Sequence, residues 1–546
     1  MIDRKQFSLF LVPCVLFLLW LLVTSVNLNK AYHIGDTVHL EIAQWLADNP
    51  LRPMSGFLNW ADNPEKIHNI KQPHLYFYLI SLWGTIGGYG ERTMHSLQAL
   101  FSLGAVVGFY LLAAKTRVSY PLLLTALFIL NPAFVVNQNM MVDVPLVTVW
   151  ILFYLTLISD NIQSDKIRYL VAALLCSAAV FIQYSGLLLI PALALSIYLR
   201  KRYSLWYFVL IPLVSLVAWS LFNYWEYGGV HILETFKGVY LTPYTVVLFV
   251  LGWIICLGSI GSFSLLFFLS GSIDKLSANN KLFRGVVLAG LVGLLAIVAA
   301  FFMGGINELV ANQLLYAVFL VNGLLLFLLI AVGLYRFLRG EGEDKNTRII
   351  LFYWLISAML CMILFSADIA TRHLLTILPP LILLLALYFL EDFKRSWAVI
   401  ALVLTLSVTF ALSISDWYYA DFYRQKAAEI RETYKDETVW FTGHWGWQWY
   451  AKKNKLLHYS IGQDCMEVGD YLAYPLDIHQ QQVAKDIRVE QVAEIVAGPV
   501  FSQGYLSTAN LASFYLSGFD KASWFLSRSP LAKIAILRIT ESDCVK

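Results

Sequence analysis

Long apolar runs recur along the first 414 residues and are separated by short polar loops. A membrane-spanning helix needs roughly 20 mostly apolar residues, and the runs predict about thirteen such helices. The runs centre on 7–26, 94–114, 118–136, 144–159, 167–182, 185–199, 204–222, 243–270, 285–303, 314–338, 349–366, 374–390 and 396–414. The composition agrees, because 59% of the 546 residues are hydrophobic and only 14% are charged. We therefore expect an α-helical polytopic membrane protein.

Basic residues lie in every second loop of this array. If the N-terminus is inside, the inner loops hold Lys115, Arg117, Lys166, Arg168, Arg200, Lys201, Arg202, Lys275, Lys281, Arg284, Arg336, Arg339, Lys345, Arg348, Lys394 and Arg395. Because cytoplasmic loops carry an excess of Lys and Arg, the N-terminus is expected in the cytoplasm. The protein is expected in the cell (inner) membrane, and an odd number of spans then places the C-terminus on its extracytoplasmic side. A cleavable signal peptide is the alternative for the run at 7–26, but no Ala-x-Ala-like site follows it, which favours a membrane anchor.

Two larger polar regions are expected on the outer side. The first is the loop 27–93, which ends in the apolar and aromatic stretch Leu75–Thr85. That stretch is too short to cross and is expected to lie along the membrane interface. The second is 415–546, predicted to be an extracytoplasmic soluble α/β domain that follows the transmembrane domain of residues 1–414. Its expected strands are Thr438–Thr442, Ile495–Ala497 and Ile534–Ile539, and its expected helices are Tyr423–Tyr434 and Leu511–Leu516.

Charge, cysteine usage and motifs narrow the possible functions. A net charge of +3 gives no reason to expect a nucleic-acid partner. Cys465 and Cys544 both fall in the C-terminal region, where they can pair in an oxidising compartment or remain free thiols. No Walker A loop, Rossmann glycine pattern, HExxH or GxSxG occurs. The middles of the spans are almost free of ionisable residues, which weakens a transporter interpretation.

Two acidic residues stand near the predicted outer face. Asp36 follows the first apolar run, and Asp143 opens the run at 144–159 just before Pro145. An ordinary structural role is open for both, because aspartate is a common N-cap of helices. The functional alternative is that Asp36 is a general base tuned by partial burial at the membrane surface. Asp143 is then a second acid of the same cavity, which holds a metal or the acceptor.

Basic residues occur on the same predicted face. Lys71 and His74 close the first outer loop, and Arg372 and His373 open a late span. Membrane anchoring and snorkelling explain such residues without any function. They are also candidates for binding the phosphate of a lipid donor. The loop 223–242 contains further candidate metal ligands, although their spacing matches no compact site: Glu226, His231, Glu234 and Lys237.

The order of these motifs resembles a known family. The matching stretches are Gly35–Ala43, Lys71–Leu75, Asn131–Asp143 and Arg372–Leu375 before Pro379. A single span, an outer loop with an acid near its start, an interfacial helix and about twelve further spans look like the GT-C superfamily. Within it, the chain is most similar to protein O-mannosyltransferases and bacterial lipid A aminoarabinose transferases. Weak similarity extends over most of the membrane region, and it is carried by order and topology rather than by one specific motif.

The resemblance implies an activity and assigns roles. The expected enzyme is a glycosyltransferase that moves a sugar from a polyprenyl-phosphate donor to a hydroxyl of a lipid, glycan or protein acceptor, usually with inversion. By the same match, Asp36 is the base, Asp143 is the second acid, and Lys71 and Arg372 neutralise the departing phosphate. A divalent metal ion is a candidate cofactor. The sequence departs from the family in two places, since Asp36 is flanked by Gly35 and Thr37 rather than a second acid, and Gln72 separates Lys71 from Pro73.

Two other functional classes stay open at this point. One is a membrane transporter or lipid flippase without transferase activity. The other is an outer-face sensor or scaffold whose C-terminal domain binds glycans, for which Gly443–Trp447 offers aromatic surface. Acids at the outer face, together with few charges inside the spans, favour the enzyme.

Overall fold

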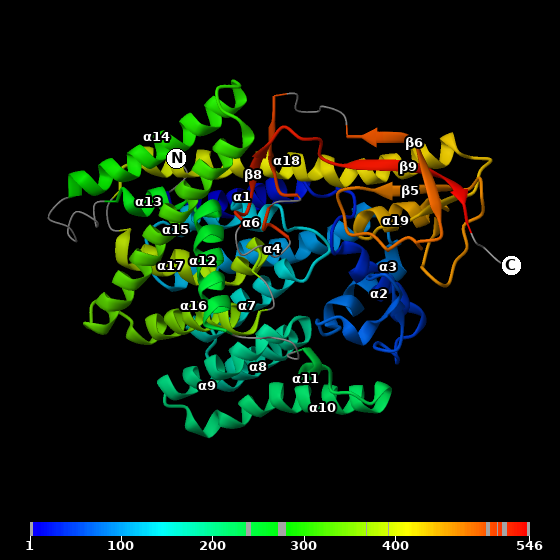
Figure 1. Cartoon of the computed structure of the whole chain (residues 1–546). Coiled ribbons are helices and arrows are strands. Elements are labelled where there is room, and N and C mark those ends of the chain that lie inside the picture. The colour runs from blue at the N-terminus through cyan, green and yellow to red at the C-terminus, as the bar shows by residue number, and fades with distance from the viewer. Residues whose placement is uncertain are drawn as a thin grey trace.

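The structure is a computed structural model that describes residues 4–235, 242–270, 280–366, 369–390, 393–497, 503–509, 512–515 and 521–542. Lys237, Lys275 and Cys544, all named above, lie outside these ranges. Most of the described chain is helical, and a smaller sheet lies at one end of the molecule (Figure 1). The expected class, a polytopic helical protein with a C-terminal α/β region, is confirmed.

The apolar runs form helices. Among the described residues, seven helices are long and apolar enough to cross a membrane: Glu91–Lys115, Tyr203–Tyr227, Pro243–Ile260, Lys281–Phe302, Glu308–Leu338, Lys345–Phe365 and Arg395–Thr433. The helical bounds in this part of the chain are α1 Arg4–Ser25, α4 Glu91–Lys115, α5 Pro121–Ile129, α6 Pro132–Val135, α7 Asp143–Ile158, α8 Asp165–Ile182, η2 Tyr184–Leu188, α9 Leu189–Leu199, η3 Tyr203–Val209, α10 Leu210–Tyr227, α11 His231–Thr235, α12 Pro243–Ile260, α13 Ser264–Phe268, α14 Asn280–Phe302, α15 Glu308–Leu338, α16 Lys345–Phe365, η5 Thr371–Thr376, α17 Leu378–Phe389 and α18 Arg395–Thr433.

Local sequence explains where several of these helices begin and break. Asn307 caps α15 by accepting a hydrogen bond from the Val310 amide at 2.9 Å, and Asp344 caps α16 through the Thr347 amide at 3.2 Å. The run expected as one span at 118–136 is instead split between α5 and α6. Pro132 supplies no N–H and Asn131 caps α6, so one continuous helix is interrupted there.

The first outer loop folds into helices α2 (Asp36–Asp48) and α3 (Leu75–Gly87), with a short hairpin of β1 (Phe57–Leu58) and β2 (Glu65–Lys66) and the turn η1 (Ile67–Asn69) between them. The expected helix at 75–85 is therefore present as α3. Helix α2 packs against α3 and against α19 (Trp445–Lys453) of the C-terminal region. Glu41 of α2 accepts hydrogen bonds from Gln448 and Lys452 of α19, each at 2.7 Å.

The C-terminal sheet has five strands in the order β4-β3-β5-β9-β6. Strand β3 pairs in parallel with β4 and β5, while β9 pairs antiparallel with β5 and β6. The bounds are β3 Val439–Phe441, β4 Leu457–His458, β5 Tyr471–Pro475, β6 Arg488–Val496 and β9 Lys533–Glu541, and a separate hairpin joins β7 Tyr505–Ser507 to β8 Phe525–Ser527. The prediction of a helix at 511–516 is wrong in its described part, because residues 513–515 form a turn. Cys465 is disulfide-bonded.

Helix α18 connects the two regions without a break. Its 39 residues cross position 414, where the sequence pattern places the domain boundary. At 1.5 Å per residue the helix is about 58 Å long, roughly twice the thickness of a bilayer core. Figure 1 shows it running from the helical body to the sheet. The two regions are thereby joined through a rigid element rather than a flexible linker.

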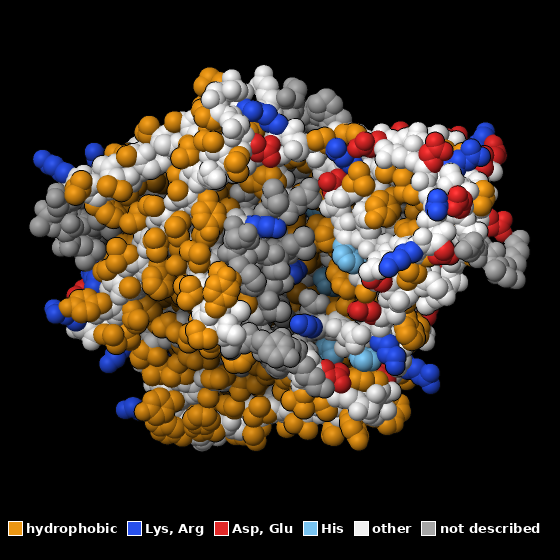
Figure 2. Space-filling view, viewed as in Figure 1, with side chains coloured by type: hydrophobic (Ala, Val, Ile, Leu, Met, Phe, Trp, Pro, Cys, Tyr) orange, Lys and Arg blue, Asp and Glu red, His pale blue; other side chains and the backbone are white. Residues whose placement is uncertain are grey.

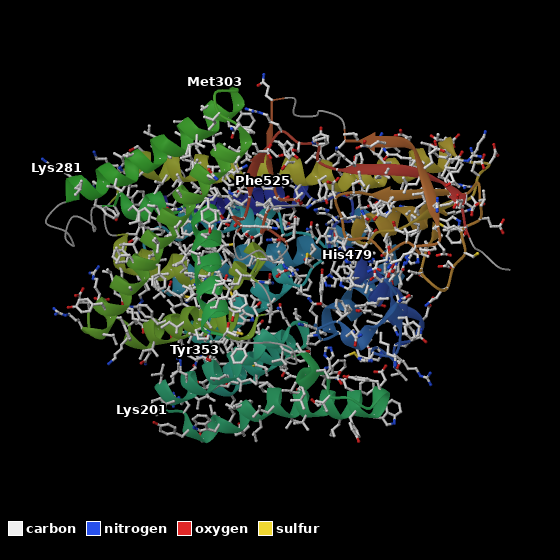
Figure 3. All side chains as sticks on the ribbon, viewed as in Figure 1. Lys201, Lys281, Met303, Tyr353, His479 and Phe525 are labelled. Carbon is white, nitrogen blue, oxygen red and sulfur yellow. The ribbon has the colours of Figure 1, made fainter. Side chains whose placement is uncertain are left out.

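The surface of the helical body differs in polarity from that of the C-terminal region. Figure 2 shows hydrophobic side chains over the long helices and charged side chains gathered over the C-terminal sheet and α19. Lys201 and Lys281, both in predicted inner loops, are labelled at the end of the body away from His479 of the C-terminal region (Figure 3). The chain is a multi-pass membrane protein.

Candidate active site

A pocket of about 580 Å³ lies among the ends of several helices. It is lined by Lys71, Gln72, Asp143, Leu146, Trp150, Gln183, Tyr184, Ser185, Leu187, Leu188, Thr235, Ala358, Cys361, Met362, Phe365, Ser366, Arg372, His373, Leu375 and Thr376. Four of the six predicted site residues therefore meet in one place: Lys71, Asp143, Arg372 and His373. They come from the loop before α3, the first turn of α7 and the turn η5, which are far apart in the sequence.

Two cations line this pocket. Lys71 is exposed and Arg372 is half-buried. Among the described residues neither side chain forms an ion pair, and the Arg372 Nη1 lies 3.9 Å from Met141 Sδ. The buried Arg372 Nε has no hydrogen-bond partner within that part of the chain. Among the described residues nothing neutralises either cation, so both are available to an anion that enters the pocket.

Asp143 is the acid of the pocket wall. It is the first residue of α7, and the N-cap position is Val142, so Asp143 does not cap the helix as the structural alternative supposed. Its side chain is buried, and its Oδ2 lacks a hydrogen-bond partner among the described residues. An unpartnered buried carboxylate oxygen costs free energy, so this atom is suited to receive a hydroxyl group.

Asp36 lies behind the pocket and does not line it. It is the first residue of α2 and is fully buried, with 0% of its surface exposed. Its Oδ2 accepts a hydrogen bond from the His33 amide and its Oδ1 accepts one from the Met140 amide, each at 2.8 Å. Burial raises the pKa of the Asp36 carboxyl from its ordinary 3.8 to about 7. A carboxyl with that pKa exchanges its proton near neutral pH.

His39 connects Asp36 to the pocket, a role that the sequence did not suggest. His39 follows Asp36 by about one turn on α2. The His39 Nδ1 lies 2.5 Å from the Met140 carbonyl, and the His39 side chain also forms a hydrogen bond with the side chain of Gln72 in the pocket wall. Burial lowers the pKa of His39 to about 4, so the ring is neutral at physiological pH. Because a carbonyl can only accept, Nδ1 carries the proton. Met140 therefore joins Asp36 through its amide and His39 through its carbonyl.

The two predicted histidines differ in their positions. His373 lines the pocket, whereas His74 is buried beside it, with its ring against Phe77, Trp219 and His231. Burial lowers the pKa of His74 to about 3. His74 is thus neutral and offers no positive charge to a phosphate.

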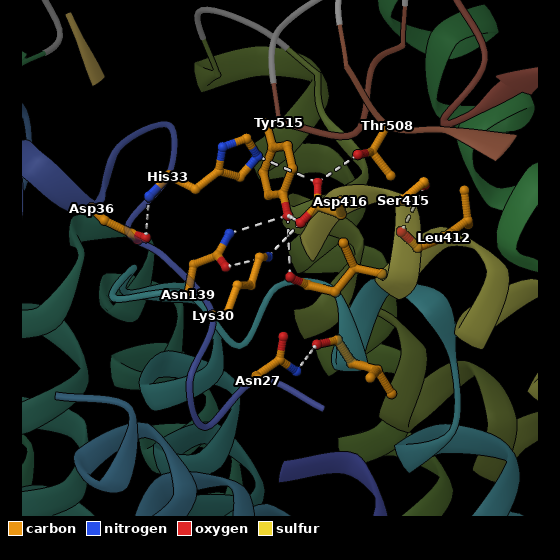
Figure 4. A network of polar contacts seen from close by, with 12 residues as sticks. Asn27, Lys30, His33, Asp36, Asn139, Leu412, Ser415, Asp416, Thr508 and Tyr515 are labelled. Carbon is orange, nitrogen blue, oxygen red and sulfur yellow. Dashed lines mark hydrogen bonds and ion pairs between the residues drawn. The ribbon is translucent and has the colours of Figure 1, made fainter. Parts of the chain in front are cut away.

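A buried polar network lies beyond Asp36 (Figure 4). Lys30, just after α1, forms an ion pair with Asp416 of α18, and Asp416 also lies 3.3 Å from His33 Nε2. Lys30 donates a further hydrogen bond to Asn139 Oδ1 at 2.7 Å. Lys30 and Asp416 are separated by 386 residues, so no local pattern in the sequence could reveal their pairing.

Metal ligands do not cluster in the described part of the chain. No group of three or more His, Cys, Asp or Glu that could hold a metal ion occurs among the described residues. The candidate ligands at 223–242 have other partners: His231 contacts Tyr184 and the Ile70 carbonyl, each at 2.8 Å, and Glu226 accepts from the Met54 amide at 2.8 Å. These contacts hold loops together, and no cofactor is established.

No protein-family model matches the sequence, and no curated protein matches it significantly. Solved structures do match. The oligosaccharyltransferase AglB from Archaeoglobus fulgidus, in complex with an inhibitory peptide and a dolichol-phosphate, is 12% identical with a TM-score of 0.47, over 85% of this chain and 66% of that one. The Archaeoglobus fulgidus oligosaccharyltransferase in complex with Zn and sulfate is 14% identical with a TM-score of 0.46, over 81% and 62%. ArnT from Cupriavidus metallidurans bound to undecaprenyl phosphate is 12% identical with a TM-score of 0.37, over 86% and 93%.

These matched structures are GT-C glycosyltransferases, the superfamily that the sequence resembles. The chain spans less than two thirds of the length of the oligosaccharyltransferases. Because the TM-scores are below 0.5, the functional proposal rests on the residues of the pocket and not on the likeness.

Proposed function

We propose that this protein is an integral membrane glycosyltransferase that moves a sugar from a polyprenyl-phosphate donor to a hydroxyl of an extracytoplasmic lipid, glycan or protein acceptor. One observation carries the proposal. Among the described residues, the pocket is lined by two cations without ion-pair partners, Lys71 and Arg372, and by a buried acid with an unpartnered oxygen, Asp143, between apolar walls. An amphipathic phosphate ester suits such a pocket.

The proposed reaction follows from these groups. The bond between the anomeric carbon and the phosphate oxygen breaks, and the polyprenyl phosphate leaves with both electrons. Lys71 and Arg372 stabilise the negative charge that develops on the phosphate. The acceptor oxygen forms the new bond to the anomeric carbon from the opposite face, so the configuration inverts, and a carboxylate takes the proton of the hydroxyl. A donor that carries its own lipid presents the sugar at the membrane surface.

Two acids are available for the proton, and we assign it to Asp36. Its pKa of about 7 matches a base that works near neutral pH. Asp36 is fully buried, so the assignment requires the Met140 segment to move away from its carboxylate when substrates bind. Asp143, already in the pocket wall, then orients the acceptor hydroxyl. If the segment does not move, Asp143 is the acid that is placed to take the proton.

The proposed orientation has the N-terminus in the cytoplasm and the pocket on the outer side of the cell membrane. It is supported by the basic residues of alternate loops. The pocket is built from loop 71–72, the start of α7 and the end of α16, which this topology puts on one face.

The test is a transfer assay on purified protein in detergent, with radiolabelled polyprenyl-phosphate sugars and extracted cell-envelope acceptors. Wild type is expected to move label from lipid to acceptor, and Asp36→Asn is expected to lower kcat by at least about 100-fold, as for loss of a general base. Asp48→Asn is the matched control, because Asp48 is an exposed residue at the other end of α2.

The outcomes separate the assignments. Full transfer by Asp36→Asn, with loss in Asp143→Asn, moves the base to Asp143. No transfer with any donor, together with substrate-dependent flux in vesicles, contradicts the transferase and favours a carrier.

A further inference from the structure

The hairpin of β7 and β8 and the turn beside it are packed into the helical body rather than onto the C-terminal sheet. We call the described residues 503–509, 512–515 and 521–527 the docked segment. Trp524 Nε1 donates to the Ser259 carbonyl of α12 at 3.0 Å. Leu526 exchanges two hydrogen bonds of 2.8 Å with the side chain of Asn312 in α15. Ser415 of α18 bonds the Leu506 carbonyl.

Tyr515 of this segment holds the loop that leads to Asp143. The hydroxyl of Tyr515 accepts a hydrogen bond from Asn139 Nδ2 at 3.1 Å. Its proton faces Asp416 Oδ2 at 2.8 Å and the Val136 carbonyl at 3.1 Å. Thr508 donates to the other oxygen of Asp416 at 2.5 Å, and all these side chains are buried (Figure 4).

Asn139 directly precedes Met140, whose amide and carbonyl bond Asp36 and His39. The opposite side of Asn139 is fixed by Lys30 through Oδ1 at 2.7 Å. The Asn139 side chain therefore lies between Tyr515 and Lys30, and its position sets that of Met140. A shift of Tyr515 passes to Asp36 through a single residue of backbone.

A second contact reaches the other wall of the pocket. The amide of Thr371 donates to the Ser513 carbonyl at 2.9 Å, and the Thr371 hydroxyl lies 2.5 Å from Ser523 Oγ. Thr371 is the first residue of η5 and directly precedes Arg372. The same short segment thus touches the residue before Arg372 and the residue before Met140.

We propose that the docked segment positions the active site, with Tyr515 and Ser513 as positioning residues that act through Asn139 and Thr371. This rests on the proposed function and gives the C-terminal region a part in it: the segment couples the acid side of the pocket to its cationic side. Tyr515 touches no substrate in this scheme. Its effect is on the placement of Met140, and through it on Asp36 and the Asp143 loop.

The test compares Tyr515→Phe with Tyr459→Phe. The first keeps the ring and its edge contact with His33, and removes the three hydroxyl contacts. The second removes a hydroxyl that accepts from the Ala484 amide at 3.3 Å, in a separate small core of the C-terminal sheet. Both side chains are buried, so the pair is matched in chemistry and in burial.

Hydrogen–deuterium exchange in detergent gives a readout that needs no enzyme activity. Tyr515→Phe is expected to speed amide exchange in residues 137–142 at least about tenfold, as for loss of a buried hydrogen bond, and Tyr459→Phe is not. Equal exchange in the two variants overturns the proposal, whether or not the protein transfers sugar. In the transfer assay, kcat is expected to fall about 10- to 100-fold in Tyr515→Phe with the donor KM nearly unchanged.

Two further outcomes are decisive. Faster exchange with an unchanged kcat contradicts a positioning role. If Tyr515→Phe does not fold, Thr508→Val tests the same network through the other oxygen of Asp416, with a smaller effect expected in the same direction. Absence of transfer in wild type defeats the proposed function, while the exchange comparison still decides whether the segment holds the loop.

Discussion

Replacing Asp36 with asparagine is expected to change how the stability of the protein depends on pH. Burial raises the pKa of Asp36 from 3.8 to about 7 in the folded protein. Between these values the folded protein holds a proton that the unfolded chain releases, so stability falls as pH rises. A pKa difference of about 3 corresponds to about 4 kcal/mol, all of it lost by pH 8 and none of it below about pH 4.

Asp36→Asn removes this titration. Asparagine has one carbonyl oxygen for the two amides of His33 and Met140, so the variant also loses a hydrogen bond worth roughly 1–3 kcal/mol, independently of pH. The assay is thermal unfolding in detergent, followed by tryptophan fluorescence from pH 5 to pH 8. Wild type is expected to lose more of its Tm over this range than Asp36→Asn, while Asp48→Asn follows wild type. Parallel profiles for wild type and Asp36→Asn would refute the raised pKa. If Asp36 is the base, activity must rise with pH around 7, opposite in direction to stability.

Three further predictions concern the cations and the acids. Lys71→Met and Arg372→Met are each expected to raise the donor KM by about 10- to 100-fold, because each removes a charge-assisted hydrogen bond to the phosphate. Lys66→Met, at an exposed lysine in β2, is the control and is expected to leave the donor KM unchanged. Equal KM values in all three variants would exclude phosphate binding by Lys71 and Arg372. Lys30→Met leaves Asp416 charged and buried without its partner, so the free energy of unfolding is expected to fall by about 3–5 kcal/mol. Thermal unfolding would show this loss as a lower Tm, and an unchanged Tm would contradict the buried ion pair. In the pH–rate profile of wild type, kcat is expected to increase with pH with a midpoint near 7. A midpoint near 4 would speak against Asp36 as the base.

The helices could be predicted because their signal is local. The apolar runs at 94–114, 314–338 and 349–366 predicted the C-terminal ends of α4, α15 and α16 to within one residue, while the helices begin three to six residues earlier, in polar sequence that hydropathy does not mark. The prediction of a single span at 118–136 is wrong, because one proline interrupts the helix but barely lowers the mean hydropathy of an apolar stretch. Helix α18 passes position 414 because polar residues continue a helix as well as apolar ones do, and hydropathy marks only the end of the apolar part.

The pocket could be predicted in part. The order of motifs and the alternation of basic loops put Asp143, Lys71 and Arg372 on one face, and the structure brings them together. Topology gives the side of the membrane but not the direction of a side chain, so neither the burial of His74 nor the turn of Asp36 toward Met140 could be foreseen.

Long-range contacts had no sequence signal. The docked segment reads as an ordinary polar stretch, and its contact with Asn139 joins residues 376 positions apart. The pairing of Lys30 with Asp416 is of the same kind. Each side chain taken alone has a simple surface explanation, and only the folded chain shows that they are buried together.

The central claim is that the pocket between Lys71, Asp143 and Arg372 receives a lipid phosphate. Its most direct test is a structure determined with a bound polyprenyl phosphate. The account predicts that the phosphate lies within hydrogen-bond distance of Lys71 and Arg372, with the prenyl chain along the apolar wall that includes Leu146 and Met362. A phosphate bound at another place, with this pocket empty, would contradict it.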